Sequence, residues 1–523
     1  MARKRVFITG VTGSMGGAGL EKLLSRGDKF DVVTLARPSK KNRKALKPFA
    51  GREGIEIVWG DLRNYDDVLK CVTGADIVLH VAALISPEAD RDPELARAIN
   101  VGSTRNIVEA IKSQPHPDEI RLVYIGSVAM TGDRLYPIHV GRTGDPLKPS
   151  IFDYYACTKI ESERIVAESG LKYWVSLRQT FIAIPDIMGL LGPIVFHMPW
   201  EACVEFCTAK DSGLLLANVC EESVPEEFWR RFYNVGGGVG TRVTALSMAR
   251  GHVEALNLAP LWDISDRNWY ALRNFHCHWF EDSDILNDYL NFRTMNLNDH
   301  LEAIAKDLPW FLKITGLPPF RWVAESDWLK GLLKKYFMRP MARRSPESPL
   351  HWIENGHEEK ISAFFKDKKT WSEIPSSWED IREPDETDYL RLSHGYDESK
   401  SDDGLTFLDV RSAASFRGGE CVSGEDEWNG IHGSLKWRCW RAHEFEMTTN
   451  SVIKGGHWCP QCTPAVLGWD YDQEARNNPF FAQVWHTNHD KDEDNFYPTI
   501  LRNEHEQVRP ESGRLSVDES RSS

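Results

Sequence analysis

Two side chains spaced for proton transfer stand near the middle of the chain. Tyr155 and Lys159 are four residues apart, so a helix would place both on one face. A free tyrosine has a pKa of about 10 and is a poor base at neutral pH, and a nearby lysine cation would lower that pKa. Ser127 follows an apolar run and falls where a strand is expected to end. Its hydroxyl could hydrogen-bond a substrate oxygen while the tyrosine moves the proton.

Three glycines near the N-terminus predict a turn that binds an anion. Gly10, Gly13 and Gly16 follow the apolar segment 6–8 and precede a helical pattern over 17–26. A backbone without Cβ atoms can turn tightly and let a pyrophosphate approach, and the next helix points its free N–H groups at that anion. Glycine triplets also occur in ordinary turns, but this one lies between a strand and a helix, where a dinucleotide-binding fold begins.

The elements that must position these residues alternate along the chain. Helical patterns over 93–112 and 154–169 separate short apolar runs, and this alternation predicts a parallel, doubly wound sheet of the α/β class. The candidate strands are 5–9, 32–35, 55–58, 77–80, 122–126 and 174–178.

These motifs together resemble the extended short-chain dehydrogenase/reductase family, also called the NAD-dependent epimerase/dehydratase family. The resemblance rests on Thr9-Gly10-x-x-Gly13-x-x-Gly16, on Ser127 and on Tyr155-x-x-x-Lys159, and it covers about residues 3–260. Segments 60–62, 80–83, 100–104 and 233–238 resemble further family segments in the correct order. The resemblance implies a Rossmann-type fold with a substrate-binding part towards residue 260.

The resemblance also implies roles for particular residues. Ser127, Tyr155 and Lys159 would be catalytic, and Lys159 would also hold the nicotinamide ribose. Asn100 would either organise the proton-relay side of the site or pack as a buried helix residue. The implied cofactor-binding set is Gly10, Thr12, Gly13, Ser14, Met15, Gly16, Arg37, Asp61, Leu62, Ala82, Ala83, Tyr155 and Lys159.

The choice of cofactor depends on the residues after the second predicted strand. NAD-preferring relatives usually place an acidic side chain there to hold the ribose 2′-hydroxyl. This chain has Ala36 and Arg37, with Lys40 and Lys41 close behind. An arginine can bind two oxygens of a 2′-phosphate at once, so we expect NADP, with NAD as the alternative. A basic solvated loop would explain the same residues without any cofactor.

The residues after Ser127 and an apolar segment further along the chain bear on the reaction class. Family dehydratases carry an Asp-Glu pair directly after the Ser/Thr, whereas Val128 and Ala129 follow Ser127 here. The segment 187–196 is strongly apolar and favours an apolar carbonyl or alcohol as substrate. A core helix or a dimer contact would explain the same apolar residues. We expect an NADP-dependent alcohol dehydrogenase or ketoreductase acting on an apolar, steroid-like compound. The alternative is a sugar-nucleotide epimerase with tightly held NAD.

A second constellation lies near the C-terminus. Cys439 and His443 precede a Cys-Pro-x-Cys knuckle formed by Cys459 and Cys462. Three thiolates and one imidazole suit a tetrahedral, structural zinc site. The pattern resembles treble-clef zinc-ribbon modules, except that the residue before the histidine is Ala442 where glycine is usual. His457 and Cys421 are alternative ligands.

A zinc ribbon raises a different class of function, an adaptor that binds protein or nucleic acid. Acidic residues at 420 and 425–427 argue against nucleic acid, because phosphate contacts need cations, so protein contact is the favoured role. His276 and His278 lack supporting ligands beyond Cys277 and Glu281, and ordinary aromatic packing is expected there.

The chain of 523 residues is long enough for several domains. We expect a Rossmann domain with its substrate segment over 1–260, a helical extension over 261–395, an acidic linker over 396–415, a zinc module over 416–475 and a polar tail over 476–523. A basic amphipathic stretch over 328–344 is expected to cover the reductase core or a partner subunit, with peripheral contact to an anionic membrane as the alternative.

Composition narrows the class further. Hydrophobic residues make up 41%, charged residues 27% and the net charge is −14, which is ordinary for a globular protein and indicates no general polyanion-binding surface. Ten scattered cysteines fit a reducing compartment, and the short apolar segment near the N-terminus predicts a strand rather than a signal peptide. We expect a cytoplasmic enzyme, and the resemblance implies a homodimer.

Overall fold

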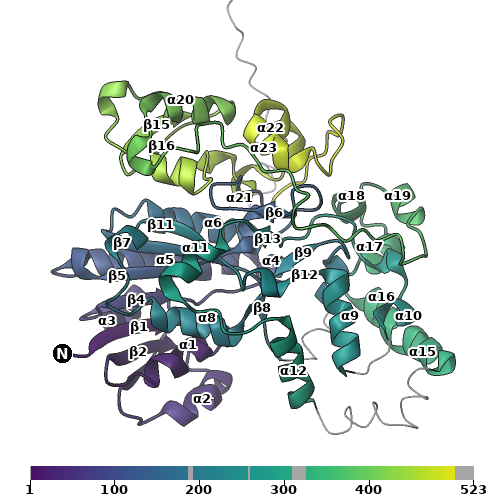
Figure 1. Ribbon diagram of the computed structural model, residues 1–523, viewed down its shortest axis with the longest axis horizontal. Helices are drawn as coiled ribbons and strands as arrows, with labels where there is room; N and C mark the ends of the chain where they lie inside the picture. The colour runs from purple at the N-terminus through teal and green to yellow at the C-terminus, as the bar shows by residue number, and fades with distance from the viewer. Residues whose placement is uncertain (1, 186–192, 257–259, 309–325, 501–523) are drawn as a thin grey trace, which may run out of the picture. The chain divides into compact units, whose positions relative to one another are not determined.

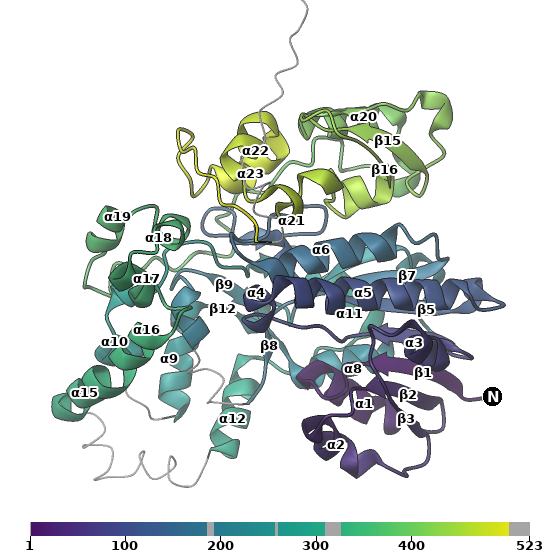
Figure 2. The same ribbon diagram turned by 180° about the vertical axis from the view of Figure 1, so that it is seen from behind.

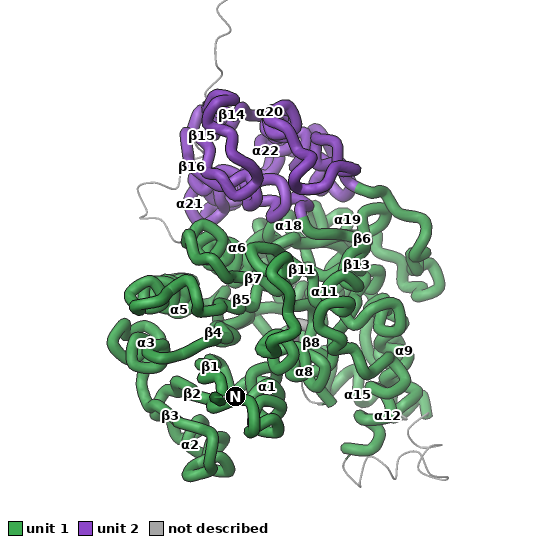
Figure 3. Tube along the Cα trace, turned by 60° about the vertical axis from the view of Figure 1, so that its left-hand side comes forward, with its two compact units in different colours: residues 1–143, 147–391 green, residues 144–146, 392–523 purple. Residues whose placement is uncertain are grey.

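The computed structural model describes residues 2–185, 193–256, 260–308 and 326–500. The chain divides into two compact units, coloured separately in Figure 3. Unit 1 comprises residues 1–143 and 147–391, and unit 2 comprises residues 144–146 and 392–523. Each unit has its own apolar core and is described separately below.

Unit 1 is built on a seven-stranded, wholly parallel sheet (Figure 1). Its strand order, β11-β7-β5-β4-β1-β2-β3, reverses direction between β1 and β4, which makes the sheet doubly wound. The predicted fold class is therefore confirmed for this unit. The strands are β1 Lys4–Thr9, β2 Phe30–Ala36, β3 Ile55–Trp59, β4 Ile77–His80, β5 Arg121–Ser127, β7 Tyr173–Gln179 and β11 Arg231–Val235.

Helices cover both faces of this sheet. On one face α1 (Ser14–Leu24), α8 (Ala209–Asn218) and α11 (Ser283–Leu290) bury leucines against the strands, and α8 and α11 lie in front of the sheet in Figure 1. On the other face α3 (Tyr65–Val72), α5 (Pro93–Lys112) and α6 (Tyr154–Ala167) bury mainly valines, isoleucines and alanines against the strands, and α5 and α6 face the viewer in Figure 2. The buried apolar layers explain why the strands read as continuous apolar runs.

Shorter elements complete unit 1. Around the sheet lie α2 Lys40–Leu46, α4 Glu88–Arg91, β6 Val140–Gly141, β8 Ile182–Ala183, β9 Cys203–Glu205, β10 Cys207–Thr208, β12 Arg242–Thr244 and β13 Trp279–Phe280. The helix α9 Ala245–Leu256 precedes the extension. The extension contributes α10 Leu261–Ile264, α12 Leu297–Asp307, α15 Asp327–Leu333, α16 Arg339–Arg344, α17 Pro349–Asn355, α18 Glu358–Phe365 and α19 Lys368–Ser372.

The basic amphipathic stretch is helical, but only part of it is covered. A π-helical turn, Lys334–Met338, joins α15 to α16. Met338 and Ala342 are buried in a cluster with Phe196. Trp328 and Tyr336 remain 71% and 66% exposed, so the aromatic side expected to cover the core faces solvent.

Unit 2 centres on a three-stranded antiparallel sheet formed by β14 (Glu420–Cys421), β15 (Ser434–Arg438) and β16 (Glu444–Thr448). The helix α20 (Phe407–Phe416) packs against it, within the predicted acidic linker. Asp409 forms a capping box with Thr406 at the start of α20 and also pairs with Lys400. The remaining helices are α21 Pro464–Leu467, α22 Tyr471–Asn477 and α23 Pro479–Trp485, the last inside the predicted polar tail.

Among the described residues, no helix combines the length and apolar character needed to cross a bilayer.

Candidate active site and metal centre

A cleft of about 850 Å³ lies at the carboxyl ends of the strands of unit 1. Ligands of doubly wound sheets bind at this edge, where the strand order reverses. Every residue assigned to catalysis or cofactor binding from the sequence lines this cleft: Gly10, Thr12, Gly13, Ser14, Met15, Gly16, Arg37, Asp61, Leu62, Ala82, Ala83, Ser127, Tyr155 and Lys159. The structure thus brings together residues from six separate stretches of the chain.

The glycine turn fits an approaching anion. Gly10 has a φ of 75°, and a Cβ there would lie 2.9 Å from the backbone nitrogen of Ala82. A Cβ at Gly16 would lie 2.3 Å from the Gly10 carbonyl oxygen, so neither position accepts a side chain without movement. Gly13 begins α1 without a side-chain cap, which leaves the first-turn amides of the helix available to a phosphate group.

A hydrogen-bond network that the sequence did not reveal fixes the loop opposite the glycine turn. The hydroxyl oxygen of Thr9 accepts hydrogen bonds from the backbone nitrogens of Val81 and Ala82, at 3.0 and 2.9 Å. It also lies 3.2 Å from Nδ1 of the buried His80. Burial lowers the pKa of His80 to about 3, so the ring stays neutral and serves to join β1 to β4.

Ser127 and Tyr155 meet in the cleft. Ser127 is the last residue of β5, and Tyr155 lies in the first turn of α6. The serine hydroxyl hydrogen-bonds the phenol, which lowers the pKa of Tyr155, but burial outweighs this and raises it to about 12. The sequence predicts that Lys159 lowers this pKa, but burial is the largest effect on the phenol and Lys159 is not among the groups that shift it.

Lys159 is buried one helical turn beyond the tyrosine. Its Nζ donates a hydrogen bond to the Ile125 carbonyl oxygen and lies 4.4 Å from the centre of the Tyr124 ring. Burial lowers the pKa of Lys159 to about 7, against an opposing effect of Glu163. A lysine with this pKa exchanges its proton near neutrality, which suits a group next to a proton donor.

Asn100 has a positioning role. Its Nδ2 donates to the Thr158 hydroxyl at 2.8 Å and to the Leu84 carbonyl at 2.9 Å, and its Oδ1 accepts from the Leu84 nitrogen at 2.7 Å. The side chain therefore ties α5 to α6 and to the loop after β4. Of the two predicted roles, the packing role accounts for these contacts.

One end of the cleft is cationic. Arg37, Lys41 and Arg63 all line it, near the ends of β2 and β3. Arg63 pairs with Asp61 at 2.8 Å and lowers the pKa of that carboxyl. Arg37 forms no ion pair within the described part of the chain, so its guanidinium is available to an anionic group of a ligand.

The other end of the cleft is apolar. Ile85, Phe181, Met198, Val204, Met248 and Phe275 line it. Of the apolar segment predicted to face a substrate, residues 187–192 lie outside the described residues, Val195 lines the cleft and Phe196 is buried in a neighbouring cluster.

The two histidines expected to pack among aromatic residues have different surroundings. His278 is buried, and Nε2 lies 3.0 Å from the Thr131 hydroxyl, so the packing prediction fits it. His276 lines the cleft, and its Nδ1 lies 3.3 Å from Oδ2 of Asp153. The sequence concealed this pair because its members are far apart along the chain.

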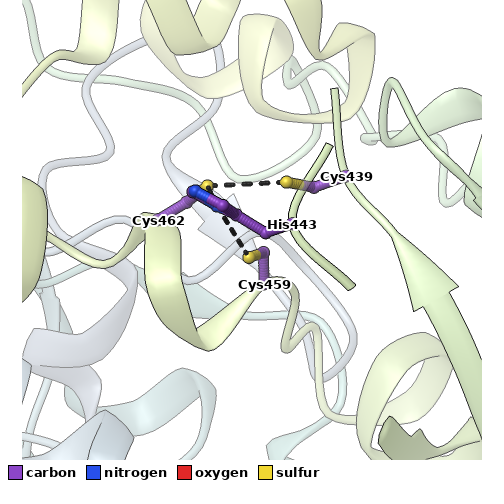
Figure 4. Close-up of side chains that lie close together, drawn as sticks. All are labelled: Cys439, His443, Cys459 and Cys462. Carbon is purple, nitrogen blue, oxygen red and sulfur yellow. Dashed lines mark hydrogen bonds between the residues drawn. The ribbon is translucent and has the colours of Figure 1, made fainter. Parts of the chain in front are cut away.

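A separate cluster in unit 2 has the donors of a metal site. The ligand atoms of Cys439, His443, Cys459 and Cys462 all lie within 4.8 Å of one another and converge on one point (Figure 4). Cys439 Sγ lies 3.7 Å from Cys462 Sγ, and His443 Nδ1 lies 3.3 Å from Cys462 Sγ and 3.6 Å from Cys459 Sγ. Regular tetrahedral zinc coordination would give about 3.8 Å between sulfurs and about 3.6 Å between sulfur and nitrogen.

The turns that present these ligands are tight. The Ala442 nitrogen donates to the Cys439 carbonyl at 2.9 Å, and the Cys462 nitrogen donates to the Cys459 carbonyl at 3.2 Å. Ala442 has a φ of 60°, a conformation that favours glycine. Neither His457 nor Cys421, the alternative ligands, belongs to the cluster within the described residues.

Comparison with known proteins connects this geometry to a family. Residues 6–184 match the model of the NAD dependent epimerase/dehydratase family. The chain is 30% identical over 166 residues to a 2-alkyl-3-oxoalkanoate reductase of Shewanella oneidensis, which is 31% of this chain and 38% of that protein. It is 27% identical over 224 residues, 42% of this chain and 62% of the relative, to a 4-hydroxy-2-methyl-3-oxo-4-farnesyl-3,4-dihydroquinoline-1-oxide ketoreductase of Stigmatella aurantiaca.

A solved structure is also similar to part of the chain. A dTDP-glucose 4,6-dehydratase of Streptomyces venezuelae with NAD bound has 18% sequence identity and a TM-score of 0.48, over 60% of this chain and 98% of that one. The chain spans about two fifths to three fifths of the length of the two curated relatives named above. The match to the family model lies in the N-terminal part of the chain, over residues 6–184.

Proposed function

We propose that this protein is an NAD(P)-dependent oxidoreductase that interconverts a carbonyl and a hydroxyl group on an apolar, steroid-like compound. The observation that carries the proposal is the single cleft in which Ser127 and Tyr155 meet between the glycine turn and an apolar end. Two curated relatives are named as reductases of oxo compounds, which supports the same class.

The side chains of this cleft suit the reduction of a ketone. A nicotinamide cofactor, when bound, supplies the hydride. The Ser127 hydroxyl hydrogen-bonds the substrate oxygen, and the Tyr155 phenol gives it a proton. Because burial raises the pKa of Tyr155 to about 12, the phenol is protonated at neutral pH and acts as the acid. Lys159 stands one turn away to restore that proton.

The residues present fit a dinucleotide. Gly10, Gly13 and Gly16 with the start of α1 would hold the pyrophosphate, and Lys159 would hold the nicotinamide ribose. Arg37, with Lys41 beside it, would bind a 2′-phosphate, which favours NADP over NAD. A sugar-nucleotide epimerase with tightly held NAD is the second candidate, and the apolar lining and the cationic end disfavour it.

Binding and turnover measurements separate these candidates. The protein is titrated with NADPH and NADH, and loss of NADPH is then followed with trans-decalone and androstanedione. We expect tighter binding of NADPH and turnover of at least one ketone. NAD that copurifies with the protein and turnover of a UDP-sugar would replace the proposal by the epimerase.

We also propose that Cys439, His443, Cys459 and Cys462 bind one structural zinc ion, as in a zinc-ribbon module. Four protein ligands leave no open coordination position, so no catalytic step is assigned to the metal. Metal analysis of the purified protein should find about one zinc per chain, and less than about half an equivalent would contradict the site. The homodimer remains a prediction, to be tested by light scattering.

A further inference from the structure

His276, which lines the cleft, forms a polar pair with Asp153 for which the proposed hydride chemistry has no use. Nδ1 of His276 lies 3.3 Å from Oδ2 of Asp153. Asp153 immediately precedes α6, and its Oδ1 accepts a hydrogen bond from the Ala156 nitrogen at 2.8 Å. The carboxylate therefore both starts the helix that carries Tyr155 and orients the histidine that lines the same cleft.

The backbone around His276 is held in a costly conformation. Asn274 and Cys277, which flank the Phe275–His276 pair, have φ angles of 71° and 120°. Residues other than glycine rarely adopt such conformations, which persist where the surroundings enforce them. Here the Asn274 amide exchanges two hydrogen bonds with the Ile151 backbone, at 2.6 and 3.1 Å. The segment is thereby fixed with the His276 ring in the cleft and stacked on Phe275.

The pairing determines which ring nitrogen can act as a base. An ionised carboxylate only accepts hydrogen bonds, so Nδ1 of His276 must carry the proton shared with Asp153. In the neutral ring Nε2 then keeps its lone pair. Within the described ranges Nε2 has no hydrogen-bond partner.

Further charged side chains lie close to this pair. Asp153 is in direct contact with His276, and Asp90 accepts a hydrogen bond from the Tyr155 nitrogen at 3.2 Å on the same helical turn. The ammonium of Lys360 acts on Asp90, and its Nζ lies 4.0 Å from the centre of the Phe152 ring.

We propose that His276, oriented by Asp153, is a second acid–base group that removes and returns a proton at the carbon next to the substrate carbonyl. The C–H bond breaks, its proton moves to Nε2, and the electron pair shifts through the carbonyl to the oxygen. Hydrogen bonds from Ser127 and Tyr155 stabilise that oxygen, so this inference rests on the proposed function. Return of the proton regenerates the ketone, and nothing is oxidised or reduced.

The test measures deuterium uptake from D₂O into trans-decalone or androstanedione, with the full-length protein and oxidised NADP present so that no reduction can occur. We expect exchange next to the carbonyl to exceed the buffer rate at least about 10-fold. His276→Asn should return exchange to within about 2-fold of buffer. His116→Asn, which changes an exposed histidine outside the cleft, should exchange like the wild type.

Asp153→Asn is the second variant. Asparagine can still cap Ala156 through Oδ1, so α6 should fold. The amide N–H groups of the asparagine then face Nδ1 of His276, and Nδ1 must accept a hydrogen bond from them. The neutral ring therefore carries its proton on Nε2, which can no longer act as the base. Exchange should fall as in His276→Asn, with an unchanged circular dichroism spectrum confirming the fold.

Reduction of the same ketones by NADPH is measured for each variant, and the ratio of exchange to reduction is compared. Wild-type exchange without reduction would support His276 while ending the oxidoreductase proposal. If the wild-type protein reduces a ketone but exchanges deuterium no faster than buffer, the role of His276 is overturned. The same follows if the His276→Asn variant exchanges deuterium as fast as the wild type. If neither reaction occurs with either ketone, both proposals fail.

Discussion

Tyr155 has the most direct part in the proposed chemistry, because its phenol supplies the proton. Replacing it with phenylalanine keeps the ring and removes only the hydroxyl that meets Ser127. We expect kcat for ketone reduction to fall about 10²–10⁴-fold, the usual contribution of general acid catalysis. Cofactor affinity, measured by fluorescence titration, should change less than about 3-fold, because other residues hold the dinucleotide.

The matched control is Tyr336→Phe, which removes a hydroxyl from a side chain that is 66% exposed on the extension. Its kcat should equal that of the wild type. Retention of more than about a tenth of the activity by Tyr155→Phe would remove the tyrosine from the proton-transfer step.

Lys159 links function to stability. Its pKa is about 7 in the folded chain against about 10.5 when unfolded, so between these values the unfolded state binds more protons and stability rises with pH. Below pH 7 both states are protonated and the cost of burying the cation is fully present. Lys159→Met removes that cost, but it also leaves the Ile125 carbonyl without a donor.

The stability gained by Lys159→Met should therefore shrink by about 2–3 kcal/mol between about pH 6.5 and about pH 9. Urea unfolding of both proteins at the two pH values measures this difference. If the difference in unfolding free energy between the two proteins is the same at both pH values, Lys159 does not titrate between them. The activity of Lys159→Met should be low at both pH values.

At the scale of elements, the turn between β15 and β16 contains one residue, Ala442, in a backbone conformation that glycine would adopt more easily. Ala442 adopts a φ of 60°, which is less favourable for alanine than for glycine. Ala442→Gly should stabilise unit 2 by about 0.5–1 kcal/mol and slow the loss of metal to a chelator. The control is Ala413→Gly in the helix α20, where glycine should destabilise by about 1 kcal/mol or more. Faster metal loss from Ala442→Gly would contradict this account of the turn.

Elements were predictable where one local pattern determined them. The strands β1 to β5 and β7 and the helix α5 follow from apolar runs and helical periodicity, because both sheet faces are covered. The sequence predicts a linker where α20 lies because the segment is rich in acidic residues, but Asp409 caps this helix and Asp402 pairs with Lys454. The His276–Asp153 pair could not be predicted from the sequence, because folding brings together two segments that are distant along the chain. In the structure, the positive φ angles of Asn274 and Cys277 flank the histidine.

At the scale of the whole molecule, the two units have separate cores. Leucines of α1, α8 and α11 pack in unit 1, whereas Val410, Leu435 and Trp437 pack around Cys439 and Cys459 in unit 2. A small core that includes its metal ligands depends on the metal for stability, since the ligands are brought together only in the folded state. Unit 2 should therefore respond to metal removal and unit 1 should not.

We expect calorimetry of the full chain to resolve two transitions, one of which a zinc chelator abolishes. NADPH affinity should change less than about 2-fold after chelation, because the cofactor cleft is lined only by residues of unit 1. Cys462→Ser should reproduce the effect of the chelator, whereas Cys421→Ser, which lies in β14 outside the cluster, should not. Loss of NADPH binding together with zinc would show that the metal centre supports the cleft as well as its own unit.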